Sequence, residues 1–309
     1  MNPFIYSSDN KRYHTLAYYN KRKYSAKIYK AVIDAGLSCP NIDGSKGEGG
    51  CIYCLDGSGY FTNEPIISVK QQLKMQIDLI KEKHPNAKIT AYFQAFSNTY
   101  SDLEMLRKIY EPIIKSKDIV GISIATRADC IDTEIADYLS SICKRTELTV
   151  EIGLQTIHDK TAALINRCHT FDEFTVTYDL LANRGIRTCV HIINGLPEEN
   201  TDMMLKTAQV LGKMKPDAIK IHLLHILAGT KLAQIYENGY YIPMSMEEYA
   251  EIVVHQLEFF PAETVIERIT GDGPKDKLLA PKWSENKKAV IAAIDKLQVR
   301  LNTWQGMNY

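Results

Sequence analysis

The sequence predicts an α/β fold, a partial (β/α)6 TIM-like barrel followed by a helical or mixed cap. From residue 65 onward, short apolar segments rich in β-branched residues alternate with longer segments of helical periodicity. The apolar segments are continuous runs, which is typical of parallel strands covered on both faces. Repeated strand–helix units of about 30 residues build barrels or doubly wound sheets. Six units fit a partial barrel better than a closed eightfold one.

The expected elements follow one another in a regular order. Six strands are expected within 29–37 and at 88–95, 119–125, 148–154, 186–193 and 218–224. Helices are expected between the strands at 69–82, 102–115, 132–143, 171–183 and 201–214. The last part of the chain differs, with helical segments at 246–259 and 284–302 around one apolar run at 264–269. We therefore divide the chain into an N-terminal arm (1–30), the barrel (31–225) and a C-terminal extension that packs on the barrel (226–309).

Composition excludes several classes of protein. The chain has 309 residues, 45% of them apolar, which suits one large domain or two smaller ones. Lys and Arg total 37 and so do Asp and Glu, so no overall charge indicates a polyanionic partner. No apolar run approaches the roughly 18 residues of a membrane span, and the N-terminus does not resemble a signal peptide. We expect a cytoplasmic protein without membrane contact.

Polar residues follow the expected strands directly. They lie at 94–99 after the second strand, 126–129 after the third, 155–156 after the fourth and 194–198 after the fifth, with His225 after the sixth. A cysteine-rich loop follows the first strand. Ligands of α/β barrels and sheets bind at the C-terminal ends of the strands. All of these residues are therefore expected at one rim.

The cysteine-rich loop contains Cys39, Cys51 and Cys54 in a glycine-rich segment. Three thiolates are one short of a closed structural zinc site, and His14 and His84 lack the spacing of a fourth ligand. A thioredoxin-like Cys-x-x-Cys would leave Cys39 unexplained. The remaining interpretation is a [4Fe-4S] cluster with three protein ligands and one open iron, with zinc as the alternative. Four further cysteines are scattered and are interpreted as buried small apolar residues: Cys130, Cys143, Cys168 and Cys189.

This loop resembles that of the radical S-adenosylmethionine (SAM) superfamily, whose usual form is Cys-x3-Cys-x2-Cys with an aromatic residue before the last cysteine. Tyr53 occupies that place. The longer first spacing, beginning Cys-Pro, resembles the catalytic subunit of Elongator. Nearly end to end, the chain is similar to an uncharacterised bacterial group often labelled YhcC/YtqA. The phrases that carry this similarity are CPNIDGSKGEGGCIYC, YFQAFSNTY, ATRADC, EIGLQT, NRCHT, HIINGLPEE, KIHLLHILAGT and RITGDGP.

The resemblance implies that Cys39, Cys51 and Cys54 hold a [4Fe-4S] cluster whose open iron binds SAM. A reducing donor such as flavodoxin or ferredoxin would then trigger cleavage to methionine and a 5′-deoxyadenosyl radical. In the place of the usual Gly-Gly-Glu motif, Gln94 or Asn98 would hold the SAM amino group. Arg167 would clamp the SAM carboxylate, for which a bidentate guanidinium is suited. The full set of implied SAM contacts is Tyr53, Gln94, Asn98, Glu151, Gln155, Arg167, Gly195 and Leu196.

Other interpretations of single residues stay open. Glu151 on an apolar strand needs a partner when buried, and a structural partner such as Arg127 is the alternative to a cofactor contact. Arg127 could instead pair with Asp129. His191, His222 and His225 are interpreted as barrel histidines, with His225 the best placed to contact a substrate. Asp272 lies in a tight turn, 271–274, and with Arg268 could reach the barrel mouth. An Elongator glutamate before the Thr-Arg pair is replaced here by Ala125.

The N-terminal arm suggests a partner. Between Lys11 and Lys30 the chain has seven Lys or Arg residues, five tyrosines and no Asp or Glu. Cations neutralise phosphates and aromatic rings stack on unpaired bases, so this composition suits RNA. A cap docked on the barrel by its tyrosines is the alternative.

Elongator-like enzymes act on the wobble uridine of tRNA, so the leading hypothesis is a radical SAM enzyme that modifies tRNA there. The neutral net charge mildly favours a small-molecule substrate in cofactor or metabolite biosynthesis. A non-catalytic iron-sulfur protein for electron transfer or sensing is the third hypothesis. No catalytic residue is assigned.

Overall fold

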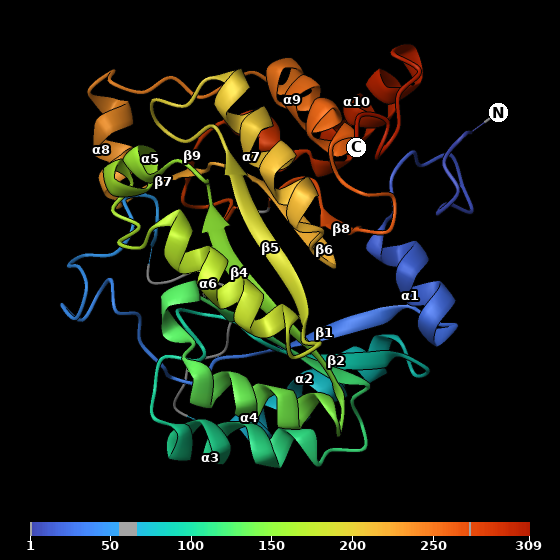
Figure 1. Cartoon of the computed structure of the whole chain (residues 1–309), viewed down its shortest axis with the longest axis vertical. Helices are drawn as coiled ribbons and strands as arrows, with labels where there is room; N and C mark the ends of the chain where they lie inside the picture. Colours follow the sequence, from blue (N-terminus) through green and yellow to red (C-terminus); the bar gives the residue numbers. More distant parts are fainter. Residues whose placement is uncertain (1, 56–66, 272) are drawn as a thin grey trace.

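The computed structural model describes residues 2–55, 67–271 and 273–309. Within these ranges, a seven-stranded, all-parallel sheet forms the centre, in the order β1-β2-β3-β4-β5-β6-β8 (Figure 1). The strands follow one another in the order of the chain, as in a barrel, and β1 and β8 are the two outermost of the described strands in this sheet. The strands are β1 Ile28–Ile33, β2 Lys88–Phe93, β3 Gly121–Thr126, β4 Glu147–Gln155, β5 Arg187–Asn194, β6 Ala218–Leu223 and β8 Val265–Arg268.

Helices connect the strands and cover the outer face of the curved sheet (Figure 1). Three of these helices begin with a capping box, in which a Ser or Thr side chain and a Glu or Gln three residues later bond reciprocally. The connecting helices are α2 Val69–Lys83, α3 Leu103–Ile114, α4 Thr133–Cys143, α5 Asp159–Leu164, α6 Phe171–Ala182 and α7 Thr201–Met214. After β6 follow β7 Ile226–Leu227, α8 Lys231–Glu237, α9 Met246–Glu258, β9 Leu278–Ala280 and α10 Lys287–Arg300.

The fold class predicted from the sequence is confirmed, with one strand more than expected. All six expected strands form, and the apolar run 264–269 adds β8, which pairs in parallel with β6. The connection from β6 to β8 passes through β7, α8 and α9 and is much longer than the earlier units. The sequence repeat does not predict β8 as a strand of the sheet, because this long connection breaks the strand–helix repeat and the pairing of β8 with β6 is formed only in the tertiary fold.

The two faces of the sheet differ in polarity. Ile89, Ala91 and Phe93 of β2 are fully buried against the outer helices. The residues between them, Thr90 and Tyr92, line a cavity on the concave inner face. Successive side chains of a strand point to opposite faces, so the continuous runs contain a polar inner row. That row sets the character of the site.

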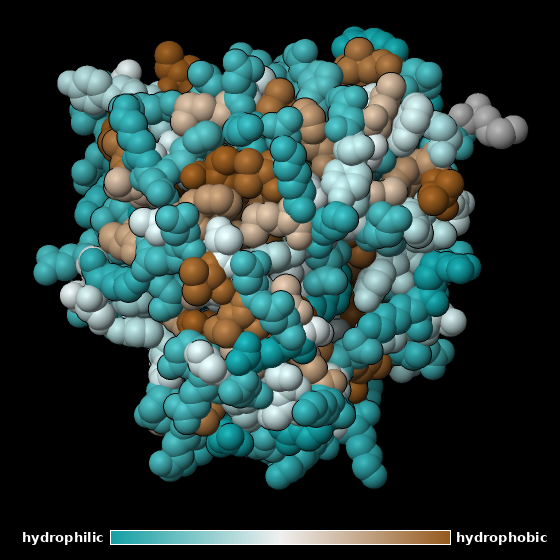
Figure 2. Space-filling view, viewed as in Figure 1, coloured by the Kyte–Doolittle hydropathy of each residue, from teal (hydrophilic) through white to brown (hydrophobic). Residues whose placement is uncertain are grey.

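The N-terminal arm is docked on the C-terminal part of the chain. Helix α1, Leu16–Tyr24, lies beside β8, and Thr15 forms a parallel bridge with Ile266. The backbone N–H of His14 donates to Gln305 Oε1 over 2.8 Å, and Tyr13 is buried. The arm therefore packs on the protein itself, as in the alternative interpretation of the arm as a docked cap. No described helix is long and apolar enough to cross a membrane, and the face in Figure 2 is largely hydrophilic with small, separate apolar patches.

Candidate functional site

A cavity of about 480 Å³ runs along the concave face of the sheet, from the cysteine loop at the C-terminal ends of the strands to α1 at the other end. This volume is within the range of small-molecule sites. Eight of the predicted site residues line it: Cys39, Cys51, Tyr53, Cys54, Gln94, Glu151, Gln155 and Arg167. Asn98, Gly195 and Leu196 are not among the lining residues.

The eleven residues between Cys39 and Cys51 fold back as a hairpin. The N–H groups of Lys46 and Gly47 both donate to the carbonyl of Pro40, over 2.9 and 3.1 Å, and the N–H of Gly50 donates to the carbonyl of Asn41 over 2.8 Å. This hairpin, residues 39–51, returns the chain to its starting point. The unusually long spacing is therefore compatible with a compact three-cysteine site.

A turn after α5 holds this hairpin in place. Asn166 Nδ2 donates to the carbonyls of Gly50 and Glu48, over 2.8 and 3.2 Å, and Asn41 Nδ2 donates to the carbonyl of Asn166. The same turn puts Cys168 against Gly47, where an added Cβ would lie 2.7 Å from Cys168 Sγ and 2.3 Å from Asn41 Oδ1. Only glycine fits there.

Cys168 is the site residue that sequence reasoning missed. The sequence predicts a buried small apolar residue at Cys168, but Cys168 is half-buried and lies at the cysteine hairpin. The phrase NRCHT was part of the family resemblance and was the available signal.

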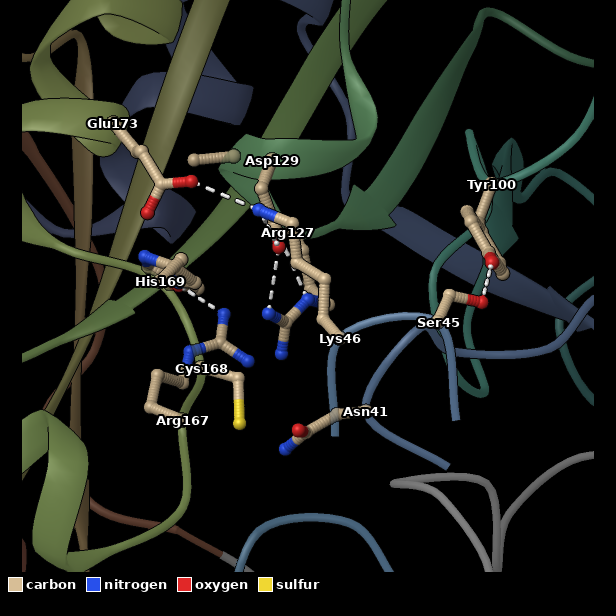
Figure 3. A network of polar contacts seen from close by, with 12 residues as sticks. Asn41, Ser45, Lys46, Tyr100, Arg127, Asp129, Arg167, Cys168, His169 and Glu173 are labelled. Carbon is tan, nitrogen blue, oxygen red and sulfur yellow. Dashed lines mark hydrogen bonds and ion pairs between the residues drawn. The ribbon is translucent and has the colours of Figure 1, made fainter. Parts of the chain in front are cut away.

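Lys46 ties the tip of the hairpin to two other elements (Figure 3). Its Nζ lies 3.1 Å from Asp129 Oδ2 and 2.8 Å from Glu173 Oε1. Asp129 also pairs in a bidentate manner with Arg127, at 2.9 and 2.8 Å, as the alternative interpretation of Arg127 expected. Although burial opposes it, the hydrogen bonds from Arg127 lower the pKa of Asp129 to about 2. Burial first, and then the charges of Arg167 and Arg127, lower the pKa of His169 to about 3.

Cys39, Cys51 and Cys54 supply three thiolate donors at this end of the cavity, the ligand type of iron-sulfur clusters. Across the described part of the chain, no three His, Cys, Asp or Glu side chains lie together closely enough for one metal ion. A zinc ion needs its ligands within about 2.0–2.3 Å of one centre. Thiolates of a cluster bind different irons and need not meet at one point. Burial, followed by the nearby charge of Cys51, raises the pKa of Tyr53 well above its usual range.

Arg167 and Gln155 form a polar cradle over Gly153. Arg167 Nη2 donates to the Gly153 carbonyl, whereas its Nε is buried without a hydrogen-bond partner in the described structure. A Cβ on Gly153 would lie 2.8 Å from Gln155 Nε2 and 3.0 Å from Arg167 Nη2. Gln155 has a φ of 75° beside a register shift in β4, which turns the end of the strand. The cradle offers donors to an anionic or polar ligand.

Asn98 is not among the residues that line the cavity. Its Nδ2 donates to the carbonyls of Ala95 and Ala125, both over 2.9 Å, and so holds the turn after β2. Ala95 and Phe96 have positive φ values, 83° and 52°, in this turn. Gln94 lines the cavity, and Asn98 braces the backbone that presents it.

Gly195 and Leu196 support the site from behind. The hydroxyl of Tyr241, which the sequence did not single out, donates to the Gly195 carbonyl over 2.6 Å. Leu196 is buried in an apolar cluster against which Tyr53 packs. Leu196 therefore belongs to the apolar support of Tyr53, and neither Gly195 nor Leu196 is among the residues that line the cavity.

Glu151 is the centre of a charged group in the middle of the cavity. It accepts hydrogen bonds from Lys30 Nζ over 2.9 Å, from His191 Nε2 over 3.1 Å and from Lys220 Nζ. Its partners are thus two lysines and a histidine, not Arg127. Although burial opposes it, these lysines hold the pKa of Glu151 well below its usual range. The sequence signal for Lys220 is a charged residue within the apolar strand segment 218–224, which indicates a buried charge that needs a partner.

The three histidines of the barrel, His191, His222 and His225, differ in their position relative to the cavity. His191 and His222 line the cavity, with ring centroids 5.2 Å apart. His225 lies near Gly271 and Gly273 at the rim and is not among the lining residues. Arg268 lines the cavity, whereas Asp272 lies outside the described residues.

Comparison with known proteins gives consistent matches. Residues 44–211 match the radical SAM superfamily, and residues 216–298 match the radical SAM C-terminal domain. The uncharacterized protein YtqA of Bacillus subtilis is 44% identical over 99% of this chain and 95% of its own length. A tRNA uridine(34) acetyltransferase of Methanocaldococcus jannaschii is 26% identical, over 82% of this chain and 52% of its own length. The structure of Elp3 from Methanocaldococcus infernus has a TM-score of 0.67 at 17% identity, covering 91% of this chain and 64% of that one.

Proposed function

The chain belongs to the radical SAM superfamily and is an enzyme of that type, and from this premise we propose that it modifies the wobble uridine of tRNA. Cys39, Cys51 and Cys54 would hold a [4Fe-4S] cluster at the cysteine end of the cavity, where the C-terminal ends of the strands lie. The observation that carries this assignment is the hairpin 39–51, which returns Cys51 to the cavity beside Tyr53 and Arg167.

The residues around the cysteines have separable tasks. A bound cluster and SAM would supply a 5′-deoxyadenosyl radical, which abstracts a hydrogen atom from the substrate. Arg167 and Gln155 would hold the SAM carboxylate through the donors they present over Gly153. Tyr53, backed by Leu196, would pack on the adenine and exclude water from the reacting atoms.

Three observations support tRNA as the substrate. A relative named a tRNA uridine(34) acetyltransferase is 26% identical to this chain, and the match covers 82% of the chain. The fold is that of an archaeal Elp3. At the opposite end of the molecule from the cysteine loop, Lys21, Arg22 and Lys27 are exposed on or just after α1. There these cations could neutralise phosphates. Several other cations of the arm are already used within the protein: Lys11 with Asp295, Lys23 with Glu147 and Lys30 with Glu151.

Two measurements test this proposal. The purified protein, reconstituted with iron and sulfide and reduced with dithionite, should convert SAM to 5′-deoxyadenosine. Mass spectrometry of tRNA nucleosides from a deletion strain should show one modified uridine depleted and its precursor accumulated. Absence of 5′-deoxyadenosine would favour the non-catalytic iron-sulfur protein. Cleavage of SAM with an unchanged tRNA profile would favour a small-molecule substrate.

A further inference from the structure

We infer that the middle of the cavity binds an anionic group of the substrate, a carboxylate or a phosphate, between Lys30, Lys220 and Arg268. This inference concerns the substrate of the proposed radical SAM reaction and rests on that function. The site is separate from the cysteine end, because its residues come from β1, β6 and β8.

The charge of the cavity wall is the first argument. Away from the cysteine end, the lining formed by the described residues contains five cationic side chains and three carboxylates, an excess of two positive charges. The cations are Lys23, Lys30, Arg187, Lys220 and Arg268, and the carboxylates are Glu147, Glu151 and Glu267. The whole chain has no net charge, so this excess is local. Confined positive charge within low-dielectric walls attracts an anion.

The second argument is that the lysines share their counter-charges. Lys30 and Lys220 both donate to Glu151, and both lie near Glu267 Oε2, at 4.0 and 3.9 Å. Glu267 is also paired with Arg187 at 3.0 Å. Thus three cations, Lys30, Lys220 and Arg187, share two carboxylates, Glu151 and Glu267. Buried charges without full compensation are costly, and a bound anion would lower that cost.

The third argument is that, away from the cysteine end, two buried polar atoms of the cavity residues have no hydrogen-bond partner among the described residues. Arg187 Nη2 and His222 Nε2 are buried and have no hydrogen-bond partner in the described structure. The Lys30 and Lys220 ammonium groups lie 4.1 and 5.2 Å from the centre of the Tyr92 ring, which holds them at the cavity wall. An anion accepts hydrogen bonds and donates none, so it matches Arg187 Nη2, and also His222 Nε2 in the tautomer that carries the proton on that nitrogen.

The position of the site suits a substrate whose anionic group lies away from the reacting atom. Glu151, Gly153 and Gln155 line the cavity from the same strand, β4. At about 3.3 Å per residue, Glu151 lies roughly 13 Å along the strand from Gln155. A nucleotide phosphate and an acidic substituent on a base are two sources of such a group.

The test measures anion binding directly. Isothermal titration of the reconstituted protein with inorganic phosphate and with acetate, at constant ionic strength in chloride, should show binding of at least one anion. Arg268→Gln and Lys30→Gln should each weaken it by about tenfold or more, since a hydrogen bond to a charged group contributes about 1.5–3 kcal/mol. Lys108→Gln, on the outer helix α3, is the matched control and should bind as the wild type does.

The outcomes separate the two proposals. Preference for phosphate identifies a nucleotide phosphate as the source, and preference for acetate identifies a carboxylate. No binding of either anion to a wild-type protein that cleaves SAM overturns the inference alone, and so does equal weakening by Lys108→Gln. A wild-type protein that binds the anion but never cleaves SAM contradicts the proposed function instead. Melting temperatures of both variants show whether a loss of binding comes from unfolding.

Discussion

Lys30 on β1 donates a hydrogen bond to Glu151 on β4 over 2.9 Å, although β2 and β3 lie between these strands in the sheet. Neighbouring strands are about 4.8 Å apart, so in a flat sheet β1 and β4 would be separated by roughly 14 Å. The contact therefore depends on the curvature of the half-barrel, and it links the strand before the cysteine loop to the strand that carries Gln155.

Removing the carboxylate of Glu151 should destabilise the fold. Glu151→Gln leaves Lys220, which is almost fully buried, with only Glu267 at 3.9 Å as a counter-charge, and breaking a buried ion pair costs up to about 3–5 kcal/mol. Urea unfolding should show this loss. Glu147→Gln, which removes an exposed ion pair with Lys23, should change the unfolding free energy by about 1 kcal/mol or less. Equal effects of the two substitutions would show that the Glu151 contacts contribute little.

Stability should fall as the pH drops below about 6.5, the usual pKa of histidine, because of His191. Burial, and then the charge of Lys220, lower the pKa of His191 to about 4. The unfolded chain binds this proton more readily, so the contribution is present above pH 6.5 and is lost progressively toward pH 4. It amounts to at most about 3 kcal/mol. Urea unfolding from pH 7 to 4 measures the slope, and His191→Gln should reduce it, while His169, whose pKa is also lowered, keeps its own contribution. A wild-type slope unchanged by this substitution would contradict the assignment.

A smaller acid dependence should come from Asp129, whose pKa is lowered to about 2. Its ion pair with Arg127 stabilises the folded state above the unfolded pKa of about 3.9 and is lost as the pH falls toward 2. Asp129→Asn should remove that part of the pH dependence. The same unfolding series, extended from pH 5 to 2, provides the measurement, with Asp118→Asn on the exposed surface as the control.

Substitution of Gly47 should release iron without unfolding the barrel. Gly47→Ala puts a Cβ against Asn41 Oδ1 and Cys168 Sγ, so the hairpin must shift. Iron per reconstituted chain should fall severalfold while the circular dichroism spectrum stays that of the wild type. Gly44→Ala is the control, because Gly44 has a φ of 88° but no atom within 4 Å of the added Cβ. Equal loss of iron from both variants would contradict crowding at position 47 as the specific cause.

Cysteine substitutions should divide into two groups. Replacement of Cys39, Cys51 or Cys54 by Ser should each abolish most bound iron and the formation of 5′-deoxyadenosine. Cys168→Ser should keep the iron, since Cys168 Sγ contacts the oxygens of Asn166 in the turn that supports the hairpin. Loss of iron from Cys168→Ser with a retained fold would make Cys168 a fourth ligand and contradict the three-cysteine assignment.

Binding of tRNA should depend steeply on salt. Neutralising Lys21, Arg22 and Lys27 together should reduce the slope of log affinity against log salt by about 2 to 3, because each phosphate contact contributes about 0.7–0.9. Filter binding between 50 and 200 mM salt provides the slopes. A triple variant on outer helices, Lys74, Lys81 and Lys108 to Gln, should leave the slope unchanged. Identical slopes for the wild type and the α1 variant would exclude α1 as the RNA contact.

Sequence patterns recovered most of the barrel but only part of the cavity. The strand prediction at 88–95 agrees with β2 to within two residues, and the helix predicted at 201–214 is α7 itself. Periodicity is a local property, so these elements could be predicted without the fold. The role of Lys220 could not, because its partner Glu151 is 69 residues away and on a strand that is not adjacent to its own.

The implied SAM contacts were also predictable only in part from the sequence. The family resemblance named Gln155 and Arg167, which meet over Gly153 at the end of β4. It also named Asn98, whose side-chain amide is used within its own turn. Which of two neighbouring polar residues faces a cavity depends on backbone angles such as the positive φ of Ala95 and Phe96. Motif spacing does not carry that information.

The sequence by itself determined the (β/α) architecture, the three-cysteine loop and the membership of the radical SAM superfamily, since all three are recorded in local periodicity and motif spacing. Only the tertiary structure decided that β8 extends the sheet, that Cys168 lies against the cysteine hairpin and that Lys30, Glu151 and Lys220 meet inside the barrel. Each of these contacts joins residues far apart in the chain. They exist because the sheet curls and brings distant strands to one concave face.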